Sequence, residues 1–227
     1  MGRDVLPHLL FDLGDVLIAV DHQRHVQGIA ALAGCSTDLV AQALFGSGLK
    51  RRLDLGQVTV TDFWTECCQR LGTKIPFIDL ARAHGDIFTP ITPTIQLLEQ
   101  ARLEGHRCCL LTNTDPLHLA TLQRRWPAIA RFGEVIASCT VGSCKPEARF
   151  FLEALRILGL TDQARHCLLI DDRQDNCQAA RSLGLQAVQA TSPAAVRRGL
   201  LAAGVGIGPG GPDAEALLDV DGARSGG

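Results

Sequence analysis

The sequence predicts an α/β fold: a mostly parallel sheet with helices on both faces, and a small helical cap inserted after the first strand. Three observations in the 227-residue chain lead to this class. Short apolar runs alternate with helical patterns, each run is almost continuously apolar, and one long stretch has helical segments but no buried strand. Strands that are apolar throughout are typical of parallel sheets covered on both faces.

Each expected element follows from a local signal. The strands are expected in chain order at His8–Leu13, Arg107–Thr112, Glu134–Ser138, Cys167–Asp171 and Gln186–Gln189. The helices between and after them are expected at Thr94–Leu103, Pro116–Arg125, Pro146–Leu158 and Asp175–Leu183. Asp115 precedes a helix-initiating proline and is a good N-cap, and Gly159 and Gly184 end the last two helices.

Residues 21–89 interrupt this alternation and are expected to form the helical cap. Their helical segments are expected at about 22–33, 37–45 and 60–71. The stretch as a whole is too long for a crossover and too short for a large independent domain. Hinges near 18–21 and 88–93 join the cap to a core of residues 1–20 and 90–203. Residues 204–227 are rich in Gly and Pro, which favours disorder, although Ala214–Leu218 has the composition of a helical turn.

The charge balance and the cysteines exclude several classes of protein. Lys and Arg number 22 against 24 for Asp and Glu, so no basic excess indicates nucleic acid or an anionic membrane as a partner. No apolar stretch approaches the roughly 20 residues that span a bilayer. The nine cysteines are an odd number without zinc-site spacing, and the first residues lack the charged-then-apolar pattern expected of a secretory signal. We expect a reduced, cytoplasmic protein that is a monomer or homodimer.

Polar residues stand where the expected strands end. Asp12, Thr112-Asn113-Thr114 and Asp171-Asp172 close three strands, and the loop after a fourth leads to Lys145. The carboxyl ends of parallel strands lie along one edge of the sheet, where ligands bind. Carboxylates without His or Cys suit a hard cation such as Mg²⁺, and a lysine and a hydroxyl beside it suit a phosphate. This edge predicts metal-assisted phosphoryl transfer.

Four segments carry a resemblance to a known family. They are F-D-L-G-D-V-L (11–17), L-L-T-N-T (110–114), G-S-C-K-P-E (142–147) and L-I-D-D-R-Q-D-N (169–176). They resemble motifs I to IV of the haloacid dehalogenase-like hydrolases, in that family's order and spacing, and the likeness extends from about residue 8 to 200. Within the family they are most similar to the branch that contains α-D-glucose-1-phosphate phosphatase. The resemblance implies a Rossmann-like core with a C1-type cap.

The resemblance also implies a nucleophile and a metal site. Asp12 would attack phosphorus and form an aspartyl-phosphate. It would bind Mg²⁺ together with the backbone carbonyl of Gly14 and the carboxylate of Asp172. Asp171 would act through water or orient the ligands, and Asn176 would support the outer shell of the metal.

Further residues would bind the substrate. Thr112 and the amide of Asn113 would hold phosphate oxygens, and Lys145 would neutralise charge on the nucleophile and the phosphoryl group. Asp21 and Arg24 lie where the first motif enters the cap and are expected near the leaving group of the substrate. A simple N-cap explains Asp21 equally well. A turn between cap helices likewise competes with a substrate-selecting role for Asp54.

One position departs from the family pattern. Most phosphatases of the family carry a second Asp two residues after the nucleophile, where it protonates the leaving oxygen; here that residue is Gly14. Asp15 is one replacement, with a hydrogen-bonded turn as the alternative interpretation. His118, in the first turn of a helix, is another, with a structural role as its alternative.

The sequence therefore predicts a Mg²⁺-dependent phosphatase acting on a small phosphorylated metabolite, with a sugar phosphate such as a hexose 1-phosphate as the first candidate. One alternative is a 2-haloacid dehalogenase-type hydrolase, which uses the same aspartate on carbon without a metal; the Asp171-Asp172 pair argues against it. The other is a catalytically impaired protein that binds phosphometabolites or regulates a partner.

Overall fold

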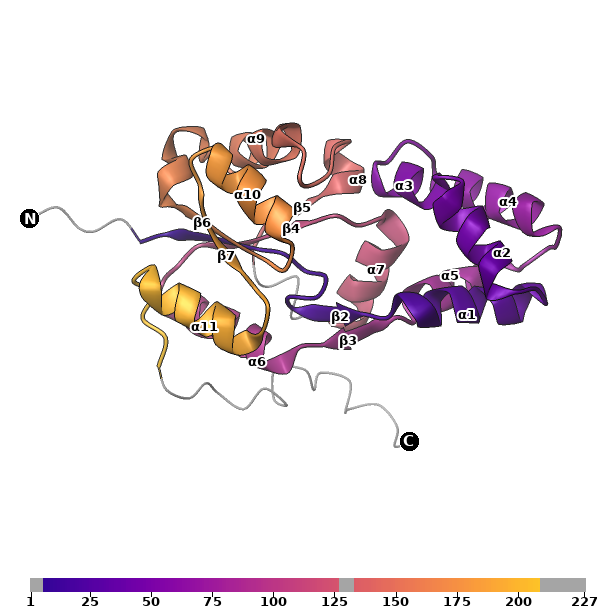
Figure 1. Cartoon of the computed structure of the whole chain (residues 1–227), viewed down its shortest axis with the longest axis horizontal. Coiled ribbons are helices and arrows are strands. Elements are labelled where there is room, and N and C mark those ends of the chain that lie inside the picture. Colours follow the sequence, from indigo (N-terminus) through magenta and orange to yellow (C-terminus); the bar gives the residue numbers. More distant parts are fainter. Residues whose placement is uncertain (1–5, 127–132, 209–227) are drawn as a thin grey trace, which may run out of the picture.

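A parallel sheet of five strands forms the centre of the larger of two lobes in the computed structural model, which describes residues 6–126 and 133–208 (Figure 1). Across the sheet the strands run β5 (Val135–Ala137), β4 (Cys108–Thr112), β1 (His8–Phe11), β6 (Cys167–Asp171) and β7 (Gln186–Gln189). Every neighbouring pair is parallel, with Phe11 opposite Leu110 on one side and Ile170 on the other. The carboxyl ends of β1, β4 and β6 therefore share one edge.

Helices cover both faces of this sheet. Leu9 and Phe11 pack on the side of α6 (Thr92–Leu103) and α11 (Pro193–Ala202). Leu10 packs on the opposite side, with α9 (Ala148–Ile157) and α10 (Gln174–Ser182). Successive side chains of a strand point to opposite faces, so a strand buried on both faces is apolar without alternation. Every residue of β4 and of β6 is buried. The predicted α/β class is confirmed.

The remaining elements of the core are short, apart from one helix. α7 (Pro116–Arg125) follows β4 and has the predicted bounds, with Asp115 as its N-cap. α8 (Ser138–Val141) follows β5, and the 3₁₀ segment η3 (Thr161–His166) precedes β6.

The smaller lobe is helical and has its own apolar core. It contains α1 (His22–Ala33), α2 (Thr37–Ala41), the π-helical turn η1 (Gln42–Gly46), α3 (Leu49–Asp54), α4 (Val60–Leu71) and α5 (Phe77–Gly85). Ile29, Leu44, Leu53, Phe63 and Leu80 are buried within it. α1, α2 with η1, and α4 are the helical segments predicted from the sequence. α3, which has only six residues, and α5, which lacks a side-chain N-cap, were not predicted.

Two short strands connect the lobes. β2 (Ile18–Val20) and β3 (Phe88–Pro90) pair antiparallel, with Ala19 opposite Thr89. The backbone N–H of Asp21 also donates to the carbonyl of Ile87 at 2.9 Å. The two chain segments expected to act as hinges thus form one hydrogen-bonded ribbon between the lobes.

The core continues past residue 203, where the sequence analysis ended it. Val205 and Ile207 are buried against the α6–α11 side of the sheet, and the Arg197 side chain donates to the carbonyl of Gly208 at 2.8 Å. The expected tail therefore begins too early at Gly204. The expected disorder beyond residue 208 and the expected turn at Ala214–Leu218 lie outside the described residues.

All nine cysteines are free thiols, and six of them are buried. Within the described ranges, no helix has by itself the length and apolar composition needed to cross a bilayer. The helices of His22–Ala33 and Thr37–Gly46 meet those criteria only as a pair, and they are bent by 110° relative to each other.

Candidate active site

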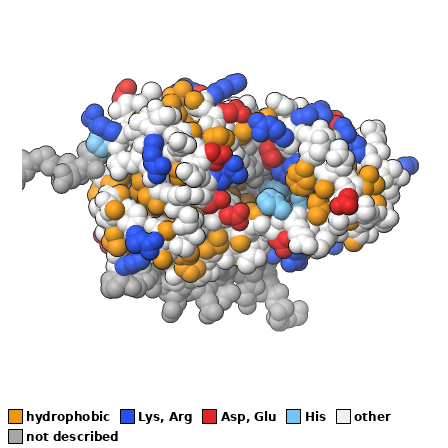
Figure 2. All heavy atoms as spheres, viewed as in Figure 1, with side chains coloured by type: hydrophobic (Ala, Val, Ile, Leu, Met, Phe, Trp, Pro, Cys, Tyr) orange, Lys and Arg blue, Asp and Glu red, His pale blue; other side chains and the backbone are white. Residues whose placement is uncertain are grey.

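A cavity of about 430 Å³ lies where the two lobes meet, beside the carboxyl ends of the central strands. Core loops contribute Asp12, Gly14, Thr112, Asn113 and Asp172 to its lining. The smaller helical lobe, called the cap from here on, contributes His25, Phe45, Lys50 and Asp54. Figure 2 shows acidic and histidine side chains gathered at this junction. The predicted strand-end cluster and the cap thus face the same space.

Lys145 joins two carboxylates beneath the cavity. Its Nζ lies 2.9 Å from Asp12 Oδ1 and 2.7 Å from Asp171 Oδ2, and it donates to the carbonyl of Leu111 at 2.8 Å. Only 1% of the Lys145 side chain is exposed, so all three protons of the ammonium group have protein acceptors. The Leu13 N–H donates to the same Asp12 oxygen at 2.6 Å. Asp12 is therefore held in one orientation at the end of β1.

Burial and charge shift the pKa values of this pair in a consistent way. Burial is the main reason that the pKa of Asp12 is raised to about 7; Lys145 opposes the rise, and Asp171 adds to it. Burial alone would lower the pKa of Lys145, but Asp12 and Asp171 outweigh it and raise that pKa. Lys145 therefore stays charged, and an additional cation beside Asp12 would favour its carboxylate form.

The two aspartates at the end of β6 differ in their surroundings. Asp171 is fully buried, and besides Lys145 it accepts from Asn176 Nδ2 at 2.8 Å and from the Arg173 N–H at 3.0 Å. Asp172 lines the cavity, where burial and the neighbouring Asp171 raise its pKa. Asp171 thus orients Lys145, and Asp172 is the carboxylate available to a ligand.

The oxygen atoms at this edge fit a divalent cation. Asp12, Asp171 and Asp172 place oxygens within 4.8 Å of one another. Asn176 Oδ1 is buried and has no hydrogen-bond partner among the described residues. A buried acceptor without a donor is costly, and a metal ion or its water would satisfy it. An all-oxygen donor set of this kind suits Mg²⁺, so the expected cofactor fits the residues present.

The loop after β4 is tied to the Lys145 loop. Asn113 Oδ1 accepts from the Lys145 N–H at 2.8 Å, and Asn113 Nδ2 donates to the Lys145 carbonyl at 2.9 Å. Thr112 and Asn113 both line the cavity. The side chain of Asn113, whose amide is expected to hold phosphate, therefore fixes the position of the lysine backbone.

Three other residues singled out in the sequence have local structural roles. Asp15 has a φ of 54° and accepts the Val20 N–H at 3.0 Å, as the turn interpretation of this residue requires. Asp21 caps α1 by accepting the Arg24 N–H at 2.8 Å, and the Arg24 side chain pairs with Asp86. Asp21 and Arg24 are not among the residues that line the cavity.

A second polar cluster, which the sequence analysis did not foresee, lies between the cap and the core. Asp115 Oδ1 caps α7 by accepting the N–H groups of Leu117 and His118 at 2.8 and 2.9 Å. Its Oδ2 lies 3.0 Å from Lys50 Nζ, 2.9 Å from His84 Nε2 and 2.9 Å from His118 Nδ1. Burial would raise the pKa of Asp115, but the two histidines and the lysine hold it well below its usual value.

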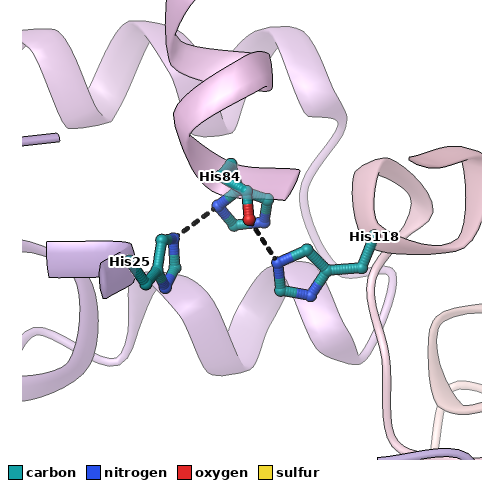
Figure 3. Close-up of side chains that lie close together, drawn as sticks. All are labelled: His25, His84 and His118. Atoms are coloured by element: carbon teal, nitrogen blue, oxygen red, sulfur yellow. Dashed lines mark hydrogen bonds between the residues drawn. The ribbon is translucent and has the colours of Figure 1, made fainter. Parts of the chain in front are cut away.

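Three histidines from three helices meet in this cluster (Figure 3). His25 Nε2 lies 2.8 Å from His84 Nδ1, and His118 Nε2 donates to the His84 carbonyl at 2.9 Å. Burial lowers the pKa of His25 to about 2 and that of His84 to about 4, so both rings are neutral. The three rings are close enough to share a metal ion. However, both nitrogens of His84 and of His118 already have protein partners, so the cluster is a hydrogen-bond network.

The chain resembles several known proteins. The mouse (Mus musculus) acyl-CoA dehydrogenase family member 10 is 29% identical over 154 residues, which are 65% of this chain. The chain spans only 14% of the length of that relative. An L-2-haloacid dehalogenase structure from Xanthobacter autotrophicus, with chloropropionic acid covalently bound, superposes with a TM-score of 0.57 at 18% identity, covering 89% of this chain and 85% of the dehalogenase.

A more similar fold is that of a HAD family enzyme from Bacteroides thetaiotaomicron in complex with magnesium and inorganic phosphate. It superposes with a TM-score of 0.74 at 21% identity and covers 82% of this chain and 94% of its own. At this identity the likeness concerns the fold. The family model of the haloacid dehalogenase-like hydrolases matches residues 6–184. On that match, and on the parallel-sheet fold with its four motifs gathered at one edge, the chain belongs to the haloacid dehalogenase-like hydrolases.

Proposed function

We propose that this protein is a cytoplasmic, Mg²⁺-dependent phosphatase that hydrolyses a small phosphorylated metabolite through an aspartyl-phosphate. The observation that carries the proposal is the ammonium of Lys145 between Asp12 and Asp171, next to the cavity-facing Asp172. An anchored carboxylate beside a fixed positive charge and further carboxylates supports a nucleophilic role for Asp12 next to a bound divalent cation. The complex of the Bacteroides protein with magnesium and inorganic phosphate supports this reading.

Each residue has a defined part in such a reaction. Asp12 attacks phosphorus and forms a P–O bond while the bond from phosphorus to the leaving oxygen breaks. Lys145 neutralises charge on Asp12 and on the phosphoryl oxygens, and Thr112 and the Asn113 N–H hold those oxygens. Asp12, Asp172 and the Gly14 carbonyl would hold Mg²⁺, which supplies further neutralisation of the phosphoryl charge. Water then hydrolyses the aspartyl-phosphate and frees Asp12.

The size of the cavity supports a small molecule as the substrate. Its volume of about 430 Å³ is typical of sites for small ligands. The cap side offers the charged groups of Lys50, Arg51 and Asp54 beside the apolar walls of Phe45 and Leu55. Mixed donors and acceptors next to an aromatic ring suit a polyhydroxylated leaving group, so a sugar phosphate such as a hexose 1-phosphate remains our first candidate.

Phosphate release from a panel of sugar phosphates, nucleotides and p-nitrophenyl phosphate tests the proposal. Each substrate is assayed with Mg²⁺ and with a chelator, for the wild type and for Asp12→Asn. We expect metal-dependent release that the Asp12→Asn variant lacks. Chelator-resistant halide release from 2-haloacids would instead identify a dehalogenase. Phosphate binding without any turnover would identify a binding or regulatory protein.

A further inference from the structure

The proposed phosphatase reaction, on which the following proposal rests, also needs a group that protonates the leaving oxygen. A sugar or alkyl leaving group departs as an alkoxide unless a proton donor meets it, and such a donor is typically worth 10²–10⁴-fold in rate. Gly14 has no side chain, and Asp15 lines the cavity from the core loop that carries Asp12, with its Oδ1 bound to the Val20 N–H. In an in-line displacement the leaving oxygen lies opposite the nucleophile. Because Asp12 lies on the core side, the leaving oxygen faces the cap.

Most titratable groups near that side of the cavity are already committed. Lys50 stays an ammonium because Asp115 and Asp54 raise its pKa, although burial opposes them. His25 is neutral and bonds to His84, and each nitrogen of His118 faces an oxygen acceptor, on Asp115 and on the His84 carbonyl. None of these three groups is suited to giving a proton to an alkoxide and recovering it from water.

Asp54 is differently placed. It is the last residue of α3 and lines the cavity, with 25% of its side chain exposed. Its Oδ1 binds Lys50 Nζ at 2.5 Å, and its Oδ2 has no hydrogen-bond partner in the described part of the chain. Burial, followed by Asp115, raises the pKa of this carboxyl, while Lys50 and His118 oppose the rise. One oxygen is anchored and the other is free to exchange a proton.

The core holds this carboxyl in position through its backbone. Ser138 Oγ donates to the Asp54 carbonyl at 2.6 Å and accepts the Thr114 N–H at 2.9 Å. Thr114 follows directly on Thr112 and Asn113, the residues assigned to the phosphate. One serine therefore connects residues 112–114, the phosphate loop, to the end of α3. Direct contacts between cap and core thus set the distance from Asp54 to the phosphate loop.

We propose that Asp54 is the acid–base residue of this enzyme, supplied by the cap. Its carboxyl gives a proton to the leaving oxygen as the P–O bond breaks, and the leaving group departs as an alcohol. The resulting Asp54 carboxylate then takes a proton from the water whose oxygen attacks the aspartyl-phosphate. Inorganic phosphate leaves, Asp12 returns as a carboxylate, and Asp54 is protonated again, so the cycle is balanced.

The test is the dependence of the rate on the leaving group. For Asp54→Asn we expect kcat/KM to fall by about 10²–10³-fold with an alkyl or sugar phosphate, and by less than about tenfold with p-nitrophenyl phosphate, whose leaving group needs no proton. Because the same variant lacks the base for the second step, p-nitrophenol should appear in a burst of one equivalent per enzyme. Asp54→Glu, which keeps the carboxyl, should retain part of the activity.

Matched variants separate this role from a structural one. Asp38→Asn removes an exposed cap carboxylate and should behave as the wild type. His22, an exposed residue at the cavity, is a competing donor, and any loss of rate in His22→Gln should be the same for the alkyl phosphate and for p-nitrophenyl phosphate. In the double variant Gly14→Asp/Asp54→Asn the new carboxyl should restore the alkyl phosphate rate, since among the described residues a Cβ at Gly14 meets only Val20 Cγ2, at 3.5 Å.

Two results would overturn the assignment. One is an equal loss with both leaving groups and no burst in Asp54→Asn. The other is a leaving-group-dependent loss in His22→Gln with Asp54→Asn unaffected. A wild-type protein that releases no phosphate from any substrate removes the proposed function and this inference together. Wild-type turnover with an unchanged Asp54→Asn removes the inference alone.

Discussion

Lys50 of the cap and Asp115 of the core form a buried ion pair across the boundary of the two lobes, with Nζ 3.0 Å from Oδ2. Asp115 follows the phosphate loop directly, and it receives His84 from the cap and His118 from its own helix on the same oxygen. Only 11% of the lysine side chain and none of the aspartate side chain is exposed. One carboxylate therefore joins the cap to the loop that is proposed to hold phosphate.

Lys50→Met should destabilise the protein strongly. Removing one partner of a buried ion pair leaves an uncompensated charge, which costs about 3–5 kcal/mol, and the two histidines that remain on Asp115 place the expected loss near 3 kcal/mol. Lys74→Met, at an exposed cap lysine, should change the free energy of unfolding by less than about 0.5 kcal/mol. Urea unfolding at pH 7 measures both. Equal stabilities of the two variants would contradict the buried pair.

Stability should also fall as the pH falls, because of the buried neutral histidines. The unfolded chain protonates His84 near pH 6.5, whereas in the folded protein burial lowers its pKa to about 4. Between these values the unfolded state binds more protons, so the free energy of unfolding decreases, by about 3 kcal/mol from His84 at pH 4.

Unfolding of the wild type and His84→Gln at pH 7, 6 and 5 checks this. The raised pKa of Asp12 acts in the opposite direction in both proteins, so the difference between them is the informative quantity. The variant should lose less stability on acidification, while His22→Gln, at an exposed histidine, should follow the wild type. Parallel curves for His84→Gln and the wild type would show that His84 is not buried neutral.

Much of this architecture could be predicted from the sequence because local patterns determine it. Apolar runs identified the strands, and Asp115-Pro116 identified the start of α7, whose bounds are as expected. Strand ends also indicated which residues gather at the sheet edge, since the edge follows from parallel topology alone.

The missed features depend on the approach of distant segments. No local pattern links Lys50, His84 and His118 to the second oxygen of Asp115, because only packing of the cap on the core brings them together. Val205 and Ile207 were missed because the surrounding glycines and prolines suggested disorder, although their own alternation buries both side chains against the sheet.

Asp171 and Asp172, although adjacent, should respond differently to amidation. Asp171 is fully buried, and Asp171→Asn weakens its charged contact to Lys145. In the absence of metal we therefore expect the free energy of unfolding to fall by about 3 kcal/mol. Asp172→Asn should leave that stability unchanged or slightly higher, since burial and Asp171 disfavour its charge. It should instead lose the stabilisation that added Mg²⁺ gives the wild type. Denaturant unfolding with and without Mg²⁺ distinguishes them, and Mg²⁺ stabilisation of Asp172→Asn would refute its role as a ligand.

A comparison of two glycines with the same φ angle tests the contact between the end of α3 and α8, which positions Asp54. Gly34 and Gly56 both have a φ of 64°, but a Cβ at Gly34 meets no described residue within 4 Å, whereas one at Gly56 would lie 2.2 Å from the Cys139 carbonyl oxygen. Gly34→Ala should therefore cost only the left-handed strain, about 1–2 kcal/mol. Gly56→Ala must in addition push the end of α3 away from α8. It should be less stable than Gly34→Ala and should lower kcat for an alkyl phosphate, which Gly34→Ala should not. Thermal unfolding and steady-state kinetics of the two variants test this, and matching values would show that the cap can shift at Gly56 without cost to stability or catalysis.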